Sequence, residues 1–346
     1  MAKHQKMRTP KSVVPLKPIR RQSDFQADWE KYLERLRTGH FLIDDNREMH
    51  GDAPKDFLRV REYAKGKSSF PNRPQRWPAY IAKVGSKWYP IESVTEHLIT
   101  RIGQVCEIDI TDSRLCIVGK QARFLSRYFL DDSCERLVHG LDLFRRFLDE
   151  ETILSIEKTP REIQEYSFQF VEQTLSDWFP AQAKEFLTEF VTMLGFDAFV
   201  GNNDRHPMNW GLIVPIGRNR ATRFAPIFDS ARGLFWNHDE NKIAACIRDL
   251  RQLLTYVEKS QPQIGWSGWN NQNRYNHFSL IEMIVIKHPE YVTTLRRFTA
   301  PDLIARCEIA LEKEFASLLS NQRRSLIVQC LQMRRDRLAA LLPQET

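Results

Sequence analysis

Three acceptor side chains in the middle of the chain, Asp204, Asn209 and Asp229, have the types and spacing that phosphoryl transfer requires. Asp204 and Asn209 are five residues apart in a segment rich in turn formers, so one loop can direct both side chains into one pocket. A β-rich run follows at residues 210–214, and after a turn at residues 215–219 a second short strand leads toward Asp229. A hairpin of this kind returns Asp229 beside Asn209.

In phosphoryl transfer, one carboxylate takes the proton of the acceptor hydroxyl, while an amide and a second carboxylate hold the metal on the nucleotide phosphates. The order Asp, Asn, Asp supplies these three roles. His206 is a further catalytic candidate that can orient the loop or assist the transfer, although a histidine beside a turn also commonly bonds to backbone. Arg205 is a candidate for contact with a phosphate. Taken alone, the segment also fits a polar surface turn, so the parts upstream must decide.

A lysine that holds the nucleotide phosphates is the next requirement of a kinase. Residues 77–85 have the pattern of a β-strand with one lysine, Lys83, among small and apolar residues. The following helix begins near Ser93 and carries Glu96, which we expect to pair with Lys83. Two alternatives stay open: Glu92 can serve as the partner instead, and residues 93–96 also fit a helix capping box in which Glu96 is structural.

Phosphate contact also requires a loop with small residues and free amides. Residues 66–69, Gly-Lys-Ser-Ser, have this composition, so Ser68 and Ser69 are candidates for nucleotide binding. There is no Gly-x-Gly-x-x-Gly sequence here, and a plain surface loop is the alternative.

Two further strands are predicted at residues 106–118 and 122–130, and the second ends where the hinge of a bilobal kinase belongs. We expect the backbone near Tyr128 and Phe129 to bind adenine, with apolar side chains such as Tyr80 on the faces of the ring. Ordinary core packing is the alternative for Tyr128 and Phe129.

Residues 203–211 (Asn-Asp-Arg-His-Pro-Met-Asn-Trp-Gly) and 226–229 (Pro-Ile-Phe-Asp) resemble the catalytic and metal motifs of HipA-like serine/threonine kinases. The catalytic segment is also similar to that of phosphatidylinositol kinases. The resemblance implies that Asp204 is the catalytic base, that Asn209 and Asp229 bind Mg²⁺, and that ATP is the phosphoryl donor.

The same resemblance implies a serine or threonine acceptor on a protein substrate, and autophosphorylation of Ser68 or Ser69. Members of the family are often toxins with a DNA-binding antitoxin, so an antitoxin or regulatory protein is an expected partner. Typical members carry an additional N-terminal subdomain, whereas about 75 residues precede the lysine strand here, which indicates a compact variant.

The expected fold is α+β, a bilobal protein-kinase-like fold with a small β-rich lobe and a larger helical lobe. We divide the chain into a basic tail (1–23), the small lobe (24–130) and the helical lobe (131–346). Apolar spacing predicts a helix at residues 24–37. In the second lobe it predicts helices at residues 141–148, 163–178 and 181–200, the last of which leads into the catalytic loop.

Composition sets the remaining limits. The 346 residues are 42% hydrophobic, enough for a sizeable core. Residues 1–23 hold seven Lys or Arg and no acidic residue, which equals the net charge of +7, so nucleic-acid contact is expected only through this tail, if at all. Six scattered cysteines and no apolar run of membrane-spanning length predict a reduced, cytoplasmic protein without a membrane span.

Two other functions remain open at this point. The catalytic segment is also compatible with a kinase that acts on a lipid or a small molecule. A catalytically silent module that binds nucleic acid or protein is the third reading, although the complete set of Asp204, Asn209 and Asp229 argues against it.

Overall fold

The computed structural model describes residues 29–44, 55–62, 73–85, 91–119, 121–131, 133–159, 165–217, 220–269 and 275–344. The basic tail and the predicted phosphate loop with Ser68 and Ser69 lie outside these residues.

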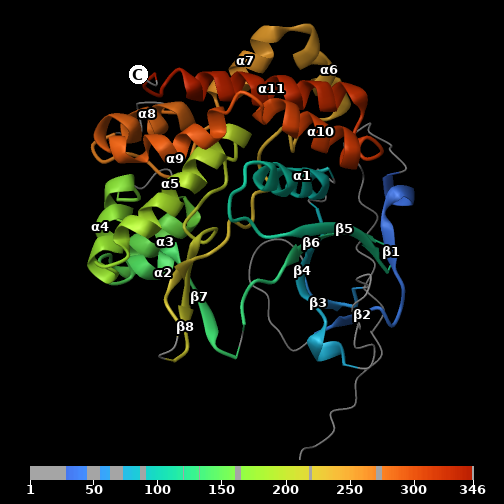
Figure 1. The fold of residues 1–346 in the computed structure, drawn as a ribbon, viewed down its shortest axis with the longest axis horizontal. Coiled ribbons are helices and arrows are strands. Elements are labelled where there is room, and N and C mark those ends of the chain that lie inside the picture. The colour runs from blue at the N-terminus through green and yellow to red at the C-terminus, as the bar shows by residue number, and fades with distance from the viewer. Residues whose placement is uncertain are drawn as a thin grey trace, which may run out of the picture.

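The N-terminal part of the chain forms a curled six-stranded sheet with the order β1-β5-β6-β4-β3-β2 (Figure 1). Its strands are β1 (Glu34–Leu36), β2 (Phe41–Ile43), β3 (Lys55–Val60), β4 (Ala79–Lys83), β5 (Ser113–Val118) and β6 (Gln121–Arg127). Neighbouring strands are antiparallel except β1 and β5, which are parallel. Side chains alternate between the two faces along β4, so Lys83 and Ile81 share one face while Tyr80 and Ala82 pack in a small core on the other.

A second sheet of three antiparallel strands has the order β7-β8-β9. Its strands are β7 (Glu135–His139), β8 (Gly211–Pro215) and β9 (Arg223–Phe224). The segment between α5 and β8 is the predicted catalytic loop, and the hairpin of β8 and β9 leads on to Asp229, as the sequence predicted. Strand β7 was not predicted.

Helices make up most of the remaining chain. They are α1 (Glu92–Val105), α2 (Gly140–Phe144), α3 (Glu150–Lys158), α4 (Phe168–Trp178), α5 (Ala183–Val200), α6 (Glu240–Arg248), α7 (Leu250–Glu258), α8 (His277–Lys287), α9 (Val292–Arg296), α10 (Leu303–Phe315) and α11 (Asn321–Ala339). Short 3₁₀ turns add Trp29–Tyr32, Pro74–Arg76, Pro289–Tyr291 and Arg297–Thr299. Among the described residues, no helix is long and apolar enough to cross a membrane.

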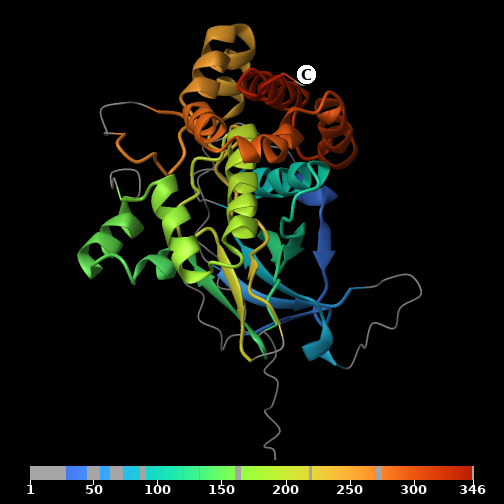
Figure 2. The ribbon, with the colours of Figure 1, turned by 60° about the vertical axis from the view of Figure 1, so that its left-hand side comes forward.

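The large core joins the sheet to the helical part through α1. Val94, Ile99 and Ile102 of α1 are fully buried and belong to the same apolar cluster as α5 and the C-terminal helices. In Figure 1, α1 lies between the sheet and α10, and in Figure 2 the long α5 crosses the middle of the helical part. Helix α5 is buried on every face from Phe190 to Val200, so it is a rigid support for the loop that follows it.

The fold is α+β, as predicted, with three local corrections. Within residues 24–37, the described part is not a helix but a short 3₁₀ turn and strand β1, because pairing with β5 outweighs the local helical spacing. The strand predicted at 106–118 begins only at Ser113. In the helical part, α3 lies between the predicted helices 141–148 and 163–178 and was not predicted. The division of the chain at residue 130 stays a prediction.

Candidate active site

The loop that carries the candidate catalytic residues begins where α5 ends. Helix α5 stops at Gly201, whose φ of +69° is left-handed, a conformation that glycine adopts without strain. A Cβ at this position would lie 2.6 Å from a guanidinium nitrogen of Arg334. Arg334 is fully buried and donates from Nη1 to the Ala198 carbonyl at 2.8 Å, at the helix end where a cation is favoured. Helix α11 therefore supports the start of the loop.

Arg205 fastens the catalytic loop to the segment that carries Asp229. It is 1% exposed and forms a buried ion pair with Asp197 of α5, with N–O distances of 2.8 and 3.0 Å. Its other N–H groups donate to the carbonyls of Asn209 and Phe228, both at 2.7 Å, and to Ser230 Oγ at 2.6 Å. All its donors face protein groups, so the expected contact of Arg205 with a phosphate is wrong, and its role is to hold the two metal-ligand candidates next to each other.

Asp204, His206 and Asn209 lie within one tight turn. Asn209 Nδ2 donates to the Asp204 carbonyl at 2.8 Å, which leaves its Oδ1 as the atom available to a metal. His206 Nδ1 accepts the backbone N–H of Met208 at 3.2 Å, and burial lowers the pKa of His206 although Asp204 opposes this. His206 is therefore a neutral ring that shapes the loop. Its part in the chemistry stays a prediction.

Asp229 occupies a strained backbone conformation. Its φ is +55°, in the left-handed region that costs a residue with a Cβ of the order of 1–3 kcal/mol when imposed by its surroundings. The preceding segment is fixed to the chain before β5, since Thr111 N–H donates to the Ile227 carbonyl at 3.0 Å and Thr111 Oγ1 does so at 3.2 Å. The strain is thus maintained by contacts with the part of the chain that carries the sheet.

Lys83 lies between two carboxylates from different parts of the chain. Its Nζ is 2.8 Å from Glu96 Oε1 and 2.7 Å from Asp229 Oδ1, and the three side chains are 12%, 6% and 31% exposed. Glu96, not Glu92, therefore lies beside Lys83. The cluster joins β4, α1 and the loop after β9, which are the elements from which the sequence predicted its members.

Burial and charge act in opposite directions within this cluster. Burial alone would raise the pKa of Asp229, but Lys83 and Lys55 outweigh it and lower the pKa to about 2. Burial raises the pKa of Glu96 to about 7 despite Lys83. Burial would lower the pKa of Lys83, but Asp229 and Glu96 reverse this and raise it. Lys83 is therefore charged at physiological pH, and Asp229 is its ionised partner.

Removing the Lys83 ammonium is expected to lower phosphoryl transfer by about 10²–10³-fold, because a fixed charge at the phosphates is lost. Lys83→Met tests this by initial rates, and Glu96→Gln is expected to give a smaller loss. Glu92→Gln is the matched control on the same helix turn and is expected to keep the wild-type rate. Equal losses of rate in Glu92→Gln and Glu96→Gln would contradict a functional role for the pair of Lys83 and Glu96.

Sequence reasoning missed Arg232, which contacts the candidate base directly. Arg232 Nε is 3.3 Å from Asp204 Oδ2, and the guanidinium carbon lies 5.4 Å from the centre of the Trp236 ring. The backbone N–H of Asn203 also donates to the Arg232 carbonyl at 3.1 Å. Burial raises the pKa of Asp204, and Arg232 partly counteracts this rise. No local pattern marks Arg232, because its target lies 28 residues earlier in the chain.

Replacing Arg232 with glutamine is expected to move the acid limb of the activity profile to higher pH. A base must be ionised to accept a proton, so activity falls as the pH drops through the pKa of Asp204. Without the guanidinium this pKa rises further, and the loss begins at a higher pH. Rates measured across the acid range test this, with Arg232→Lys as the charge-conserving control. An unchanged acid limb in Arg232→Gln would contradict it.

The donor set fits Mg²⁺ held between protein and nucleotide. Asn209 Oδ1 and Asp229 are oxygen donors of the kind that Mg²⁺ prefers, and magnesium usually takes its other ligands from phosphates and water. The described residues contain no group of three His, Cys, Asp or Glu side chains arranged around a metal position. With Asn209 and Asp229 as its two protein ligands, a metal here would take further ligands from phosphates and water.

A cavity of about 480 Å³ lies where the chain leaves β6, and Ala79 and Tyr128 are among its lining residues. The Tyr128 N–H already donates to the Ala79 carbonyl at 2.8 Å. The ring of Phe129 lies 5.8 Å from that of Phe228, next to Asp229. Tyr80 does not face this side: it is 1% exposed, packs in the core on the other face of β4 and bonds to Glu62. The expected contact of Tyr80 with adenine is therefore wrong, whereas adenine binding at Tyr128 and Phe129 stays a prediction.

Comparison with known proteins agrees with this architecture. The curled sheet and the helical part define a bilobal kinase-like fold. A family model of the HipA-like C-terminal domain matches residues 49–280, more than half of the chain, and the chain belongs to this family. The crystal structure of the Helicobacter pylori proinflammatory kinase CtkA is similar in fold, with a TM-score of 0.65 and 16% identity over 86% of this chain and 94% of that chain.

A second solved structure is the Shewanella oneidensis MR-1 toxin–antitoxin protein HipA in complex with HipB and its operator DNA. It aligns with a TM-score of 0.48 and 11% identity, over 86% of this chain and 66% of that chain. No curated protein matches the chain.

Proposed function

We propose that this chain is a serine/threonine protein kinase of the HipA-like type that uses ATP and Mg²⁺. The observation that carries the proposal is the ionic cluster of Lys83 with Glu96 and Asp229 at 2.8 and 2.7 Å. Kinases use a lysine and glutamate pair to hold the nucleotide phosphates, and they place the metal aspartate within reach of it. Family membership supports the same assignment.

In this proposal each residue has one task. Asp204 accepts the proton of the acceptor hydroxyl. The hydroxyl oxygen bonds to the γ-phosphorus of ATP, and the bond between that phosphorus and the oxygen that stays with ADP breaks. Lys83 binds the phosphates, and Asn209 and Asp229 hold Mg²⁺, which neutralises charge on the phosphates when bound. Arg232 opposes the rise in the pKa of Asp204 that burial causes, and Arg205 keeps the two loops together.

The test is transfer of ³²P from γ-labelled ATP with Mg²⁺ to the protein itself and to a cell lysate, followed by phosphoamino-acid analysis. Label on serine or threonine that is absent from Asp229→Ala supports the proposal and identifies a substrate. Label only on inositol lipids or sugars would move the assignment to a lipid or small-molecule kinase. If no label is transferred and ATP does not bind in the presence of Mg²⁺, the proposal is overturned.

Two finer features belong to the same proposal. Autophosphorylation of Ser68 or Ser69 would regulate the enzyme, and phosphopeptide mapping after incubation with ATP tests it. An antitoxin or regulatory protein as partner is supported only by family membership, and co-purification from the native host with DNase treatment tests it.

A further inference from the structure

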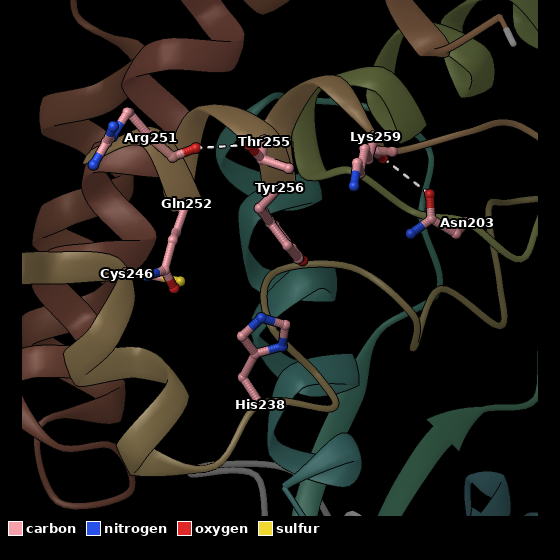
Figure 3. Close-up of a pocket in the computed structure, with 9 residues that line it drawn as sticks. Asn203, His238, Cys246, Arg251, Gln252, Thr255, Tyr256 and Lys259 are labelled. Carbon is pink, nitrogen blue, oxygen red and sulfur yellow. Dashed lines mark hydrogen bonds between the residues drawn. The ribbon is translucent and has the colours of Figure 1, made fainter. Parts of the chain in front are cut away.

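A second cavity, of about 470 Å³, lies between the catalytic loop and the hairpin of α6 and α7 (Figure 3). Asn203 lines it on the side of the catalytic loop, and His238, Tyr256 and Lys259 project toward the same space, with Arg251 at its edge. The mechanism above uses none of these side chains. The cavity is nevertheless next to the reaction, because Asn203 directly precedes Asp204.

Asn203 joins the wall of this cavity to the catalytic loop. Its Oδ1 accepts hydrogen bonds from Ser260 Oγ and from the Gln261 N–H, both at 2.9 Å. Its carbonyl accepts one from Gln263 Nε2 at 2.6 Å, and its N–H donates to the carbonyl of Arg232. The segment after α7, the catalytic loop and the segment after Asp229 therefore meet at this one residue.

Aromatic rings pack against one another beside the cavity. The rings of Phe235 and Tyr256 stack with centroids 4.2 Å apart, and the Phe235 N–H donates to the Tyr256 hydroxyl at 2.7 Å. His238 meets Tyr256 edge to face at 5.3 Å. Burial lowers the pKa of His238 to about 4, so this ring is neutral at physiological pH. The cationic character of the cavity thus comes from Lys259 and Arg251.

Acidic groups balance only part of the positive charge at the cavity. No Asp or Glu is among the described residues that line it. Within the described part of the chain, the Lys259 ammonium has no ion-pair partner. Arg251 pairs with Asp249 at 3.2 Å, but these side chains are 90% and 36% exposed, where such a pair contributes little. An anionic group entering from outside would find two cations available.

The α6–α7 hairpin also carries exposed apolar side chains. Ile247, Leu250 and Leu254 of the hairpin are 41%, 60% and 44% exposed. Helical spacing places Leu250 and Leu254 on the side of α7 away from Thr255, Tyr256 and Lys259, so the wall of the cavity does not include them. The hairpin also stands out from the helical part, with α6 and α7 at the top of Figure 1.

We propose that this cavity binds the protein substrate through an acidic side chain near its acceptor serine or threonine. Lys259 receives the carboxylate, and Arg251 at the edge of the cavity attracts acidic groups of the same substrate segment. An extended chain advances about 3.3–3.6 Å per residue, so a segment whose hydroxyl is at Asp204 reaches past Asn203 within a few residues. This inference rests on the proposed protein kinase activity, but the binding experiment that tests it does not require that activity.

The test measures binding without ATP, so that it does not depend on catalysis. The probe is a fluorescein-labelled peptide with a central serine flanked by glutamate and leucine, and its twin has lysine in place of each glutamate. Fluorescence anisotropy is expected to show binding of the glutamate peptide only. The double variant Arg251→Glu and Lys259→Glu is expected to weaken that binding by about tenfold or more and to favour the lysine twin. Lys287→Glu, an exposed lysine on α8 away from the cavity, is the matched control.

Three outcomes would overturn the proposal. The first is equal binding of the two peptides by the wild-type protein, and the second is unchanged binding of the glutamate peptide by the double variant with a wild-type unfolding midpoint. The third is complete displacement of the peptide by inorganic phosphate but not by chloride of the same ionic strength, which indicates a site for small anions only. If the ³²P assay fails but peptide binding persists, the proposed kinase function is wrong and the peptide-binding site stands.

Discussion

Asp204→Asn is expected to lower the rate of phosphoryl transfer by about 10²–10⁴-fold, the usual contribution of a general base. The amide keeps the size of the side chain but cannot accept the proton of the acceptor hydroxyl. Binding of ATP with Mg²⁺ is expected to persist, because Lys83 and Asp229 are untouched. Initial ³²P transfer rates and calorimetric ATP binding, measured on the same preparation, separate the two effects.

Asp336→Asn is the control for this experiment, since Asp336 is 55% exposed and accepts hydrogen bonds from Gln332 on the same helix, α11. It is expected to retain the wild-type rate. A rate for Asp204→Asn within about threefold of wild type would exclude Asp204 as the base. A parallel loss of ATP binding would show that Asp204 acts through the nucleotide site.

Asp197→Ala is expected to destabilise the fold by about 3–5 kcal/mol, because it leaves the charge of Arg205 buried without a partner. Both side chains of this pair are 1% exposed, and Asp197 also accepts a hydrogen bond from Asn202 Nδ2 at 2.9 Å. Urea unfolding followed by circular dichroism measures the shift in free energy of unfolding. The loops held by Arg205 should also separate, so activity is expected to fall in the remaining folded protein.

The surface pair of Arg145 and Glu150 offers a matched comparison, because its side chains are 46% and 69% exposed. Arg145→Ala is expected to change stability by less than about 1 kcal/mol. An equally small effect of Asp197→Ala would show that Arg205 is satisfied by its carbonyl partners alone.

The local chemistry of the site was predictable because it depends on short-range patterns. Turn formers around Asp204 predicted the loop, and one lysine in a strand followed by a helix with Glu96 predicted two members of the cluster. Two further facts were available but not used. Period-two alternation places Tyr80 and Lys83 on opposite faces of β4, and Asp197, an acid inside an apolar run, requires a buried partner.

Other features depend on contacts between distant segments and carry no local signal. Strand β1 forms because Glu34–Leu36 meets Cys116–Val118, although its spacing also suits a helix. Arg232 contacts Asp204 only because the segment after Asp229 folds back over the catalytic loop. The cavity beside Asn203 likewise exists only once α6 and α7 are packed.

The contact between Lys83 and Asp229 spans 146 positions of the chain, and Arg334 supports the loop at Ala198 from 136 positions further on. During translation at about 5–20 residues per second, roughly 7–30 s pass between synthesis of the lysine and synthesis of its aspartate. A ribosome-bound chain in that interval has neither the completed cluster nor the helix that supports the loop. We therefore expect translation products that end before Arg334 to lack the proposed activity.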